Sequence, residues 1–161
     1  MSILKILKFP NSGLNIKATP VKNISKNIII LINNLIETMF YYNALGIAAT
    51  QVASNNRIII INISTNNFIQ PLVLINPTIL NKSNNIVSKE GCLSFPNFFI
   101  KIKRNKNIFF KFLNLNNKYI FIKSNLLFSI CLQHEIDHIN GITIYDKVSN
   151  IKKKIILRKF V

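Results

Sequence analysis

The chain has 161 residues, a length typical of one domain with a sizeable hydrophobic core, and a formal net charge of +16. Its two cysteines exclude a disulfide framework. No apolar run reaches the roughly 18 residues of a membrane helix, and lysines interrupt the N-terminal segment too often for a signal peptide. We therefore expect one domain over residues 1–161, with no membrane partner, in the cytoplasm or, if the gene is organellar, in an organelle interior.

The charge balance has two interpretations. A strongly basic chain often binds a polyanion, but the 32 isoleucines and 25 asparagines here use A+T-rich codons, as lysine does, so genome drift also accounts for the excess. The acids are more informative because the chain holds only five of them. Four lie in or beside the motifs described below; the complete set is Glu37, Glu90, Glu135, Asp137 and Asp146.

Hydrophobic spacing predicts three helices and several strands. The helices are expected at 23–42, at 126–140, where Gly141 ends the helix, and at 150–159, a short basic segment. The strands are expected at 57–63, 72–80, 98–102, 107–113 and 119–123, with Pro77 marking an edge or a bulge. This order favours an α+β fold in which antiparallel or mixed β-sheets surround a central helix, with an N-terminal helix and a short C-terminal helix.

Both histidines of the chain lie in one pentapeptide of the central helix, His134-Glu135-Ile136-Asp137-His138. Residues i and i+4 share one helix face, so the two imidazoles can bind one metal ion. Glu135 lies one step round the helix, where it can act on a metal-bound water as a general base. The alternative, a surface helix with two solvated histidines, fits poorly with the apolar residues that flank the motif.

A metal held by two histidines needs a third protein ligand. The only downstream acid is Asp146, whereas upstream the segment Glu90-Gly91-Cys92-Leu93-Ser94 offers a thiolate. Cys92 alone could equally be a small core residue, and Cys131 is expected to pack near the site. A third segment, 44–51, is small, apolar and ends in Gln51, whose amide can donate a hydrogen bond to an oxyanion.

These three segments together resemble the peptide deformylases. The family carries a Gly-rich loop ending in Ala-Ala-x-Gln, then Glu-Gly-Cys-Leu-Ser, then Gln-His-Glu-x-Asp-His, and this chain has 46–51, 90–94 and 133–138 in the same order. The resemblance implies a metal-dependent hydrolase that removes the N-formyl group from the N-formylmethionine of nascent polypeptides. It also implies one divalent metal ion, Fe²⁺ as the expected ion with Zn²⁺, Ni²⁺ or Co²⁺ as alternatives, held by Cys92, His134 and His138.

The resemblance also assigns roles around the metal. Glu135 is the general base, and the Gln51 amide and the backbone N–H of Leu93 hold the oxyanion. The segment Leu45, Gly46 and Ile47 offers its backbone to an extended substrate, while Glu90 holds its loop or lines the substrate pocket. The apolar pocket for the methionine side chain is lined by Leu127, Ile130 and Cys131.

The chain departs from the family pattern at two positions. Ala44 stands where glycine is usual, and would be strained by roughly 1 kcal/mol if that position needs a positive φ. Phe99 stands where many bacterial members have arginine near the substrate. Arg104 matches an arginine of the family and is expected to pair with Asp137.

The partners implied are N-formylmethionyl nascent peptides and, through the basic C-terminal segment, the ribosome; we expect a monomer with no DNA partner. Three other functions stay open. One is a metallopeptidase of the H-E-x-x-H type, with a downstream carboxylate ligand. The second is a basic nucleic-acid-binding module with a structural metal, and the third is a decayed relative that has lost activity.

Overall fold

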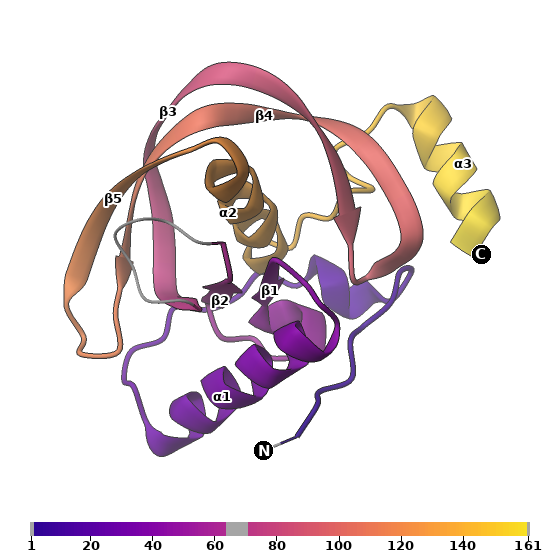
Figure 1. The fold of residues 1–161 in the computed structure, drawn as a ribbon. Helices are drawn as coiled ribbons and strands as arrows, with labels where there is room; N and C mark the ends of the chain where they lie inside the picture. The colour runs from indigo at the N-terminus through magenta and orange to yellow at the C-terminus, as the bar shows by residue number, and fades with distance from the viewer. Residues whose placement is uncertain (1, 64–70, 161) are drawn as a thin grey trace.

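The computed structural model describes residues 2–63 and 71–160. Five strands form one antiparallel sheet in the order β1-β2-β3-β4-β5. Their bounds are Gly46–Ala48, Ile58–Ile61, Leu72–Cys92, Phe95–Leu113 and Tyr119–Asn125. The long hairpin of β3 and β4 arches over helix α2, Leu126–Ile139, so that the sheet wraps the helix (Figure 1). The predicted α+β fold with a central helix is confirmed.

Helix α1, Lys26–Tyr41, packs below the short strands, and helix α3, Asn150–Phe160, lies at the far side of the arch (Figure 1). The side chain of Ser25 accepts a hydrogen bond from the backbone N–H of Ile28 and so caps the start of α1. Among the described residues, none of the helices is long and apolar enough to cross a membrane.

The core is divided by the sheet. One cluster fills the space between the sheet and α2, and includes Ile59, Phe110, Phe112 and Leu132. A second packs α1 against β1 and β2 through Leu35, Met39 and the buried side chain of Ile47. Burial on both sides explains why β2 reads as an unbroken run of isoleucine, since each of its four residues is fully buried.

The end of α2 was predicted correctly. The helix stops at Ile139, and Gly141 adopts φ +72°, a left-handed conformation that favours glycine. A Cβ there would lie 2.4 Å from the carbonyl oxygen of Asn15. Gly141 therefore lets the N-terminal segment pass close behind the helix that carries the two histidines.

The strand predictions need two corrections. Segments 98–102 and 107–113 belong to one continuous strand, β4, and β3 extends from 72 to 92 rather than ending near 80. The polar residues between the predicted strands suggested a turn, but the side chain of Arg104 is buried by pairing with Glu90 of β3. The bulge expected at Pro77 is present, since the register shifts between Ile75 and Thr78.

Candidate metal centre and active site

The two histidines of α2 and Cys92, at the end of β3, meet under the arch of the sheet. Cys92 Sγ lies 3.2 Å from His138 Nε2, which in turn lies 3.2 Å from His134 Nε2. The three ligand atoms all lie within 4.8 Å of one another. One soft sulfur and two imidazole nitrogens at this spacing form a donor set suited to a single transition-metal ion.

His134 is held in position by Glu90. Its Nδ1–H donates to Glu90 Oε2 at 2.9 Å, which directs Nε2 toward Cys92 and His138. Arg104 donates to both oxygens of Glu90 at 2.8 Å and also pairs with Asp137, which binds Lys147 at 2.9 Å. The predicted pairing of Arg104 with Asp137 is confirmed. Glu90 joins β3 to β4 and α2 through these bonds, and it lies in the wall of the cavity described below.

The charges of this cluster shift the pKa values of its members. Burial raises the pKa of Glu90, but the hydrogen bonds and charges of Arg104 and His134 outweigh it and lower the value to about 2. Burial likewise opposes ionisation of Cys92, but the charges and hydrogen bonds of His138 and His134 bring the pKa of its thiol well below the ordinary value. The site therefore favours a thiolate, the form that binds metal.

Glu135 is buried beside the histidines and differs from the other carboxylates. Burial raises its pKa, although the positive charges of His134 and His138 act in the opposite direction. Its Oε2 has no hydrogen-bond partner among the described residues. A buried carboxylate with an unpaired oxygen suits a group that exchanges a proton with a ligand.

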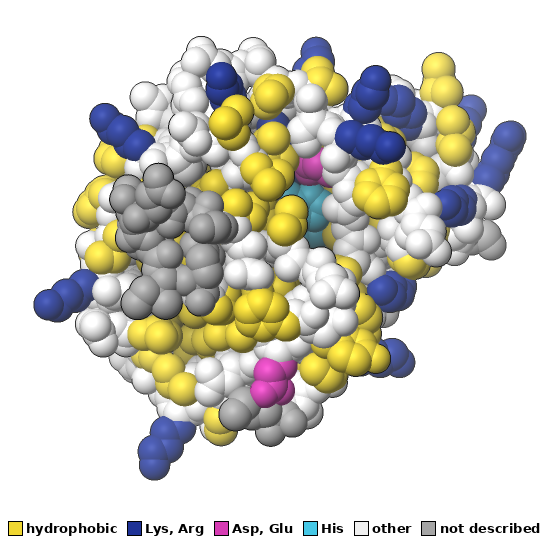
Figure 2. All heavy atoms as spheres, in the orientation of Figure 1, with side chains coloured by type: hydrophobic (Ala, Val, Ile, Leu, Met, Phe, Trp, Pro, Cys, Tyr) yellow, Lys and Arg dark blue, Asp and Glu magenta, His cyan; other side chains and the backbone are white. Residues whose placement is uncertain are grey.

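A cavity of about 950 Å³ opens onto this cluster. In Figure 2 a histidine and a carboxylate side chain are visible at its mouth, with hydrophobic side chains on either side. Most predicted site residues line it: Leu45, Gly46, Gln51, Glu90, Cys92, Leu93, Leu127, Ile130, Cys131, His134 and Glu135. His138 lies behind the other ligands, and Ile47 does not reach the cavity because its side chain points into the cluster under α1.

Gly46 permits the close approach of β1 to α2. A Cβ at this position would lie 2.8 Å from both Cys131 Sγ and Glu135 Oε1. β1 is the edge strand of the sheet. The carbonyl of Leu45 accepts from the N–H of Asn62 at 2.8 Å, so alternation along an antiparallel strand directs the backbone of Gly46 to the free edge.

Gln51 is fixed beside the thiol. Its Oε1 accepts from the backbone N–H of Ala48 at 2.9 Å, which leaves Nε2 to donate toward Ser94 Oγ at 3.3 Å and Cys92 Sγ at 3.6 Å. The amide donor thus faces the metal-ligating end of the cavity. The carbonyl of Leu93 accepts from Lys8 Nζ at 2.6 Å, which anchors the turn after Cys92.

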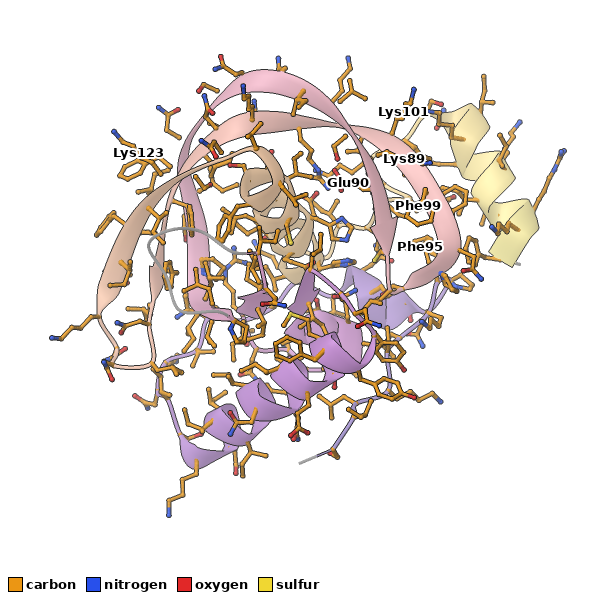
Figure 3. The ribbon with its side chains drawn as sticks, in the orientation of Figure 1. Lys89, Glu90, Phe95, Phe99, Lys101 and Lys123 are labelled. Atoms are coloured by element: carbon orange, nitrogen blue, oxygen red, sulfur yellow. The ribbon has the colours of Figure 1, made fainter. Side chains whose placement is uncertain are left out.

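Several residues of the cavity wall were not predicted, among them Lys8, Tyr42, Lys89 and Pro96. Lys8 and Tyr42 come from segments without a motif, whereas Lys89 and Pro96 flank the motif at 90–94. Figure 3 shows Lys89 and Phe99 side by side at the rim, and Lys89 Nζ lies 5.5 Å from the centre of the Phe99 ring. The strain expected at Ala44 is absent, because the preceding Asn43 takes the positive φ, at 50°.

The downstream carboxylate does not join the cluster. Asp146 Oδ2 accepts from both the N–H and the hydroxyl of Thr143 at 2.8 Å, and so closes a turn after α2. The metallopeptidase alternative needed this carboxylate as its third metal ligand. The geometry instead brings Cys92 to that place.

A family model for polypeptide deformylase matches residues 3–154. A peptide deformylase of Thermodesulfovibrio yellowstonii is 42% identical over 161 residues, covering 99% of this chain and 98% of the relative. The chain belongs to the peptide deformylase family. A peptide deformylase of Buchnera aphidicola subsp. Schizaphis graminum is 40% identical over 161 residues, covering 100% and 96%.

Solved structures of the family agree. The peptide deformylase of Ehrlichia chaffeensis in complex with actinonin superposes with a TM-score of 0.92 at 33% identity, over 99% of this chain and 96% of the other. The peptide deformylase of Legionella pneumophila superposes with a TM-score of 0.92 at 33% identity, over 99% of this chain and 94% of the other. Peptide deformylases are metal-dependent hydrolases that remove formyl groups, and the cluster of one thiol and two imidazoles fits that requirement.

Proposed function

We propose that this chain removes the formyl group from the N-formylmethionine of nascent polypeptides, as one domain over residues 1–161. The observation that carries the proposal is the convergence of Cys92 Sγ and two histidine nitrogens within 4.8 Å, beside a buried carboxylate at one end of a large cavity. A structural metal site could use the same cysteine and histidines, but it would need neither the buried Glu135 carboxylate nor the cavity that opens onto the ligands.

Cys92, His134 and His138 would hold one divalent ion, for which we propose Fe²⁺, with Zn²⁺, Ni²⁺ or Co²⁺ as substitutes. When bound, such an ion acts as a Lewis acid that polarises a carbonyl and lowers the pKa of a coordinated water. The lowered pKa of Cys92 supports this assignment because it favours the thiolate. Glu90 supports it as well, since it holds Nδ1 of His134 and so directs Nε2 toward the other two ligands.

Glu135 would move the proton. Its unpaired Oε2 can accept a proton from the attacking water and then deliver it to the amine that leaves when the formyl C–N bond breaks. The raised pKa supports both halves of this step, because a carboxyl with a pKa nearer neutrality accepts and returns a proton with less cost than an ordinary one.

The oxyanion that forms on the formyl group would be held by the amide of Gln51 and the backbone N–H of Leu93. Gln51 supports this role because its oxygen is already engaged by Ala48, so the nitrogen end must face the thiol. A donor fixed before the reaction stabilises the developing charge without reorganisation.

The substrate would bind as an extended strand along β1, using the backbone of Leu45, Gly46 and Ile47. Gly46 supports this best, since its backbone faces the free edge of the sheet. The methionine side chain would enter the part of the cavity lined by Leu127, Ile130 and Cys131, and Glu90 would close the polar side of the wall.

Beyond the peptide, we propose a monomer in the cytoplasm, or in an organelle interior for an organellar gene. The basic helix α3, with Arg158 and Lys159 in its last turn, would contact the ribosome. Lysine and arginine side chains at this density can bind RNA phosphates, which supports the contact.

The test is release of formate from formyl-Met-Ala-Ser by protein purified without oxygen and loaded with Fe²⁺ or Ni²⁺. Glu135→Gln is the matched control, since it removes the proton acceptor and keeps the shape. We expect activity in the parent and a loss of about 100- to 10,000-fold in the variant. Equal activity of both, or hydrolysis of Met-Ala-Ser itself, would contradict the proposal.

A further inference from the structure

We propose that the face of β3, β4 and β5 turned away from α2, called here the outer face, binds single-stranded RNA. Side chains of a strand alternate between its two faces. Because Ile102, Ile108, Phe110 and Phe112 of β4 are buried, the odd-numbered residues from 99 to 111 lie on the outer face. The register extends the assignment to β3 and β5.

The charged residues of the outer face are lysines. Lys89 and Lys101 are direct cross-strand partners, Lys103 follows one step along, and Lys111 and Lys123 lie farther along the arch. Figure 3 shows Lys89 and Lys101 at one end of the arch and Lys123 at the other. In the described part of the chain, none of these lysines forms an ion pair. Like charges placed opposite one another are unfavourable unless an anion relieves them.

No carboxylate lies on this face. Glu37 belongs to α1, Glu135 and Asp137 to α2, and Asp146 follows α2, while Glu90 points inward to Arg104. Among the described residues, the outer face therefore carries positive charge alone, although acids are present elsewhere in the chain. A uniformly positive surface of this kind attracts a polyanion.

Exposed aromatic rings alternate with the lysines. Phe99, Tyr119 and Phe121 are exposed by 63%, 59% and 58%. Phe121 also lies beside Phe109, with 6.3 Å between the ring centres. Large rings left in water on a sheet, with lysines between them, form the stacking platforms on which proteins hold the bases of single strands.

A groove crosses the same face. It has a volume of about 370 Å³, and two cross-strand rows of side chains form its walls. One row is Asn81, Phe109 and Lys123; the other is Ser83, Asn107 and Asn125. The row between them supplies the floor. A ring, an ammonium group and three amides around one hollow can stack on a base, bind its phosphate and hydrogen-bond its edges.

The choice of RNA over DNA rests on the proposed function, since an enzyme that acts on nascent chains works beside RNA. The proposal that this face binds a single strand of nucleic acid does not depend on that function. Lys89 and Phe99 belong both to this face and to the rim of the catalytic cavity. RNA bound along the lysines would therefore lie next to the entrance used by the peptide.

The test measures binding of the full, metal-loaded chain to a fluorescent oligouridylate of about 12 nucleotides, a length typical of such sites, by anisotropy over a range of salt. The variants are Lys101→Ala, Lys123→Ala and Phe121→Ala; Lys26→Ala, on α1, is the matched control. We expect each lysine variant to reduce the slope of log affinity against log salt by about 0.7. Phe121→Ala should weaken binding roughly 5- to 150-fold with the slope unchanged.

Three results would overturn the proposal: an effect of Lys26→Ala equal to that of Lys101→Ala, no effect of Phe121→Ala, or displacement of the RNA by vesicles of phosphatidylglycerol. If oligothymidylate bound as tightly as oligouridylate, the outer face would still be a single-strand binding site, but the preference for RNA would be overturned. Formate release from free formyl-Met-Ala-Ser should be unchanged in these variants, and Glu135→Gln should still bind RNA. A failure of the chain to bind RNA can therefore be distinguished from a failure of the catalytic proposal.

Discussion

The carboxylate of Glu90 and the imidazole of His134 are joined by a hydrogen bond of 2.9 Å, although they lie 44 residues apart in the chain. The bond holds Nδ1 of His134, so Nε2 is the nitrogen that is directed toward Cys92 and His138. Arg104 in turn holds both oxygens of Glu90. The long β3–β4 hairpin thus orients a ligand that belongs to a helix.

Glu90→Gln should therefore weaken the metal site without removing a ligand. We expect metal affinity to fall by about 10- to 100-fold, the usual cost of losing an outer partner of a ligating histidine. Competition with a chelator of known affinity measures the change. Glu37→Gln on α1 is the control, because it removes one carboxylate at a distance from the site. Unchanged affinity in Glu90→Gln would mean that α2 alone orients His134.

Glu90 also predicts how stability depends on pH in the metal-free protein. Its pKa of about 2 lies below the ordinary value of 4.5, so the folded state favours the ionised form. The resulting stability, about 3 kcal/mol at most, is present above pH 4.5 and is lost as the pH falls toward 2. Urea unfolding between these limits measures the loss. The Glu90→Gln variant should be less stable than the parent at pH 6, and its free energy of unfolding should fall less between pH 4.5 and pH 2. If the free energies of both proteins fell in parallel, Glu90 would not be the source of the pH dependence.

The central helix and its chemistry could be predicted from the sequence because both are local. Two histidines four residues apart define a face of a helix, and Gly141 marks the end of that helix. The long strands could not be predicted in the same way. The polar run around Arg104 predicts a turn when it is taken alone. In the folded chain, Glu90 on the neighbouring strand pairs with Arg104 and allows its side chain to be buried. Tertiary pairing overrides a local signal there.

The cavity wall shows the same limit. Lys8 and Tyr42 reach the site from two segments with no motif, and only the folded chain brings them to it. The prediction for Ile47 concerns its backbone and stays a prediction. The residue belongs to a recognised segment, but strand alternation sends its side chain into the core under α1. Spacing within a motif predicts which backbone approaches the site. The direction of each side chain depends on how the strand pairs in the sheet, which the motif does not predict.

The two cysteines should behave differently toward metal. Both are unpaired thiols, but only Cys92 lies in the three-ligand cluster, while burial raises the pKa of Cys131 well above its ordinary value. Cys92→Ala should lower metal affinity by more than about 100-fold, beyond the cost of losing an outer partner. Cys131→Ala should retain one ion per chain. Metal analysis after gel filtration measures both, and equal retention would remove Cys92 from the ligand set.

Gln51 should act on the rate rather than on the binding of metal or peptide. Its amide nitrogen points at the thiol end of the cavity, because the oxygen is held by Ala48. Gln51→Leu keeps the volume and removes the donor, so kcat should fall by about 100- to 1,000-fold. The KM for formyl-Met-Ala-Ser should change little, since the donor acts on charge that develops only in the transition state. Ser94→Ala is the control, because it removes the other partner of the amide and leaves the donor in place. A rise in KM with kcat preserved would place Gln51 in substrate binding instead.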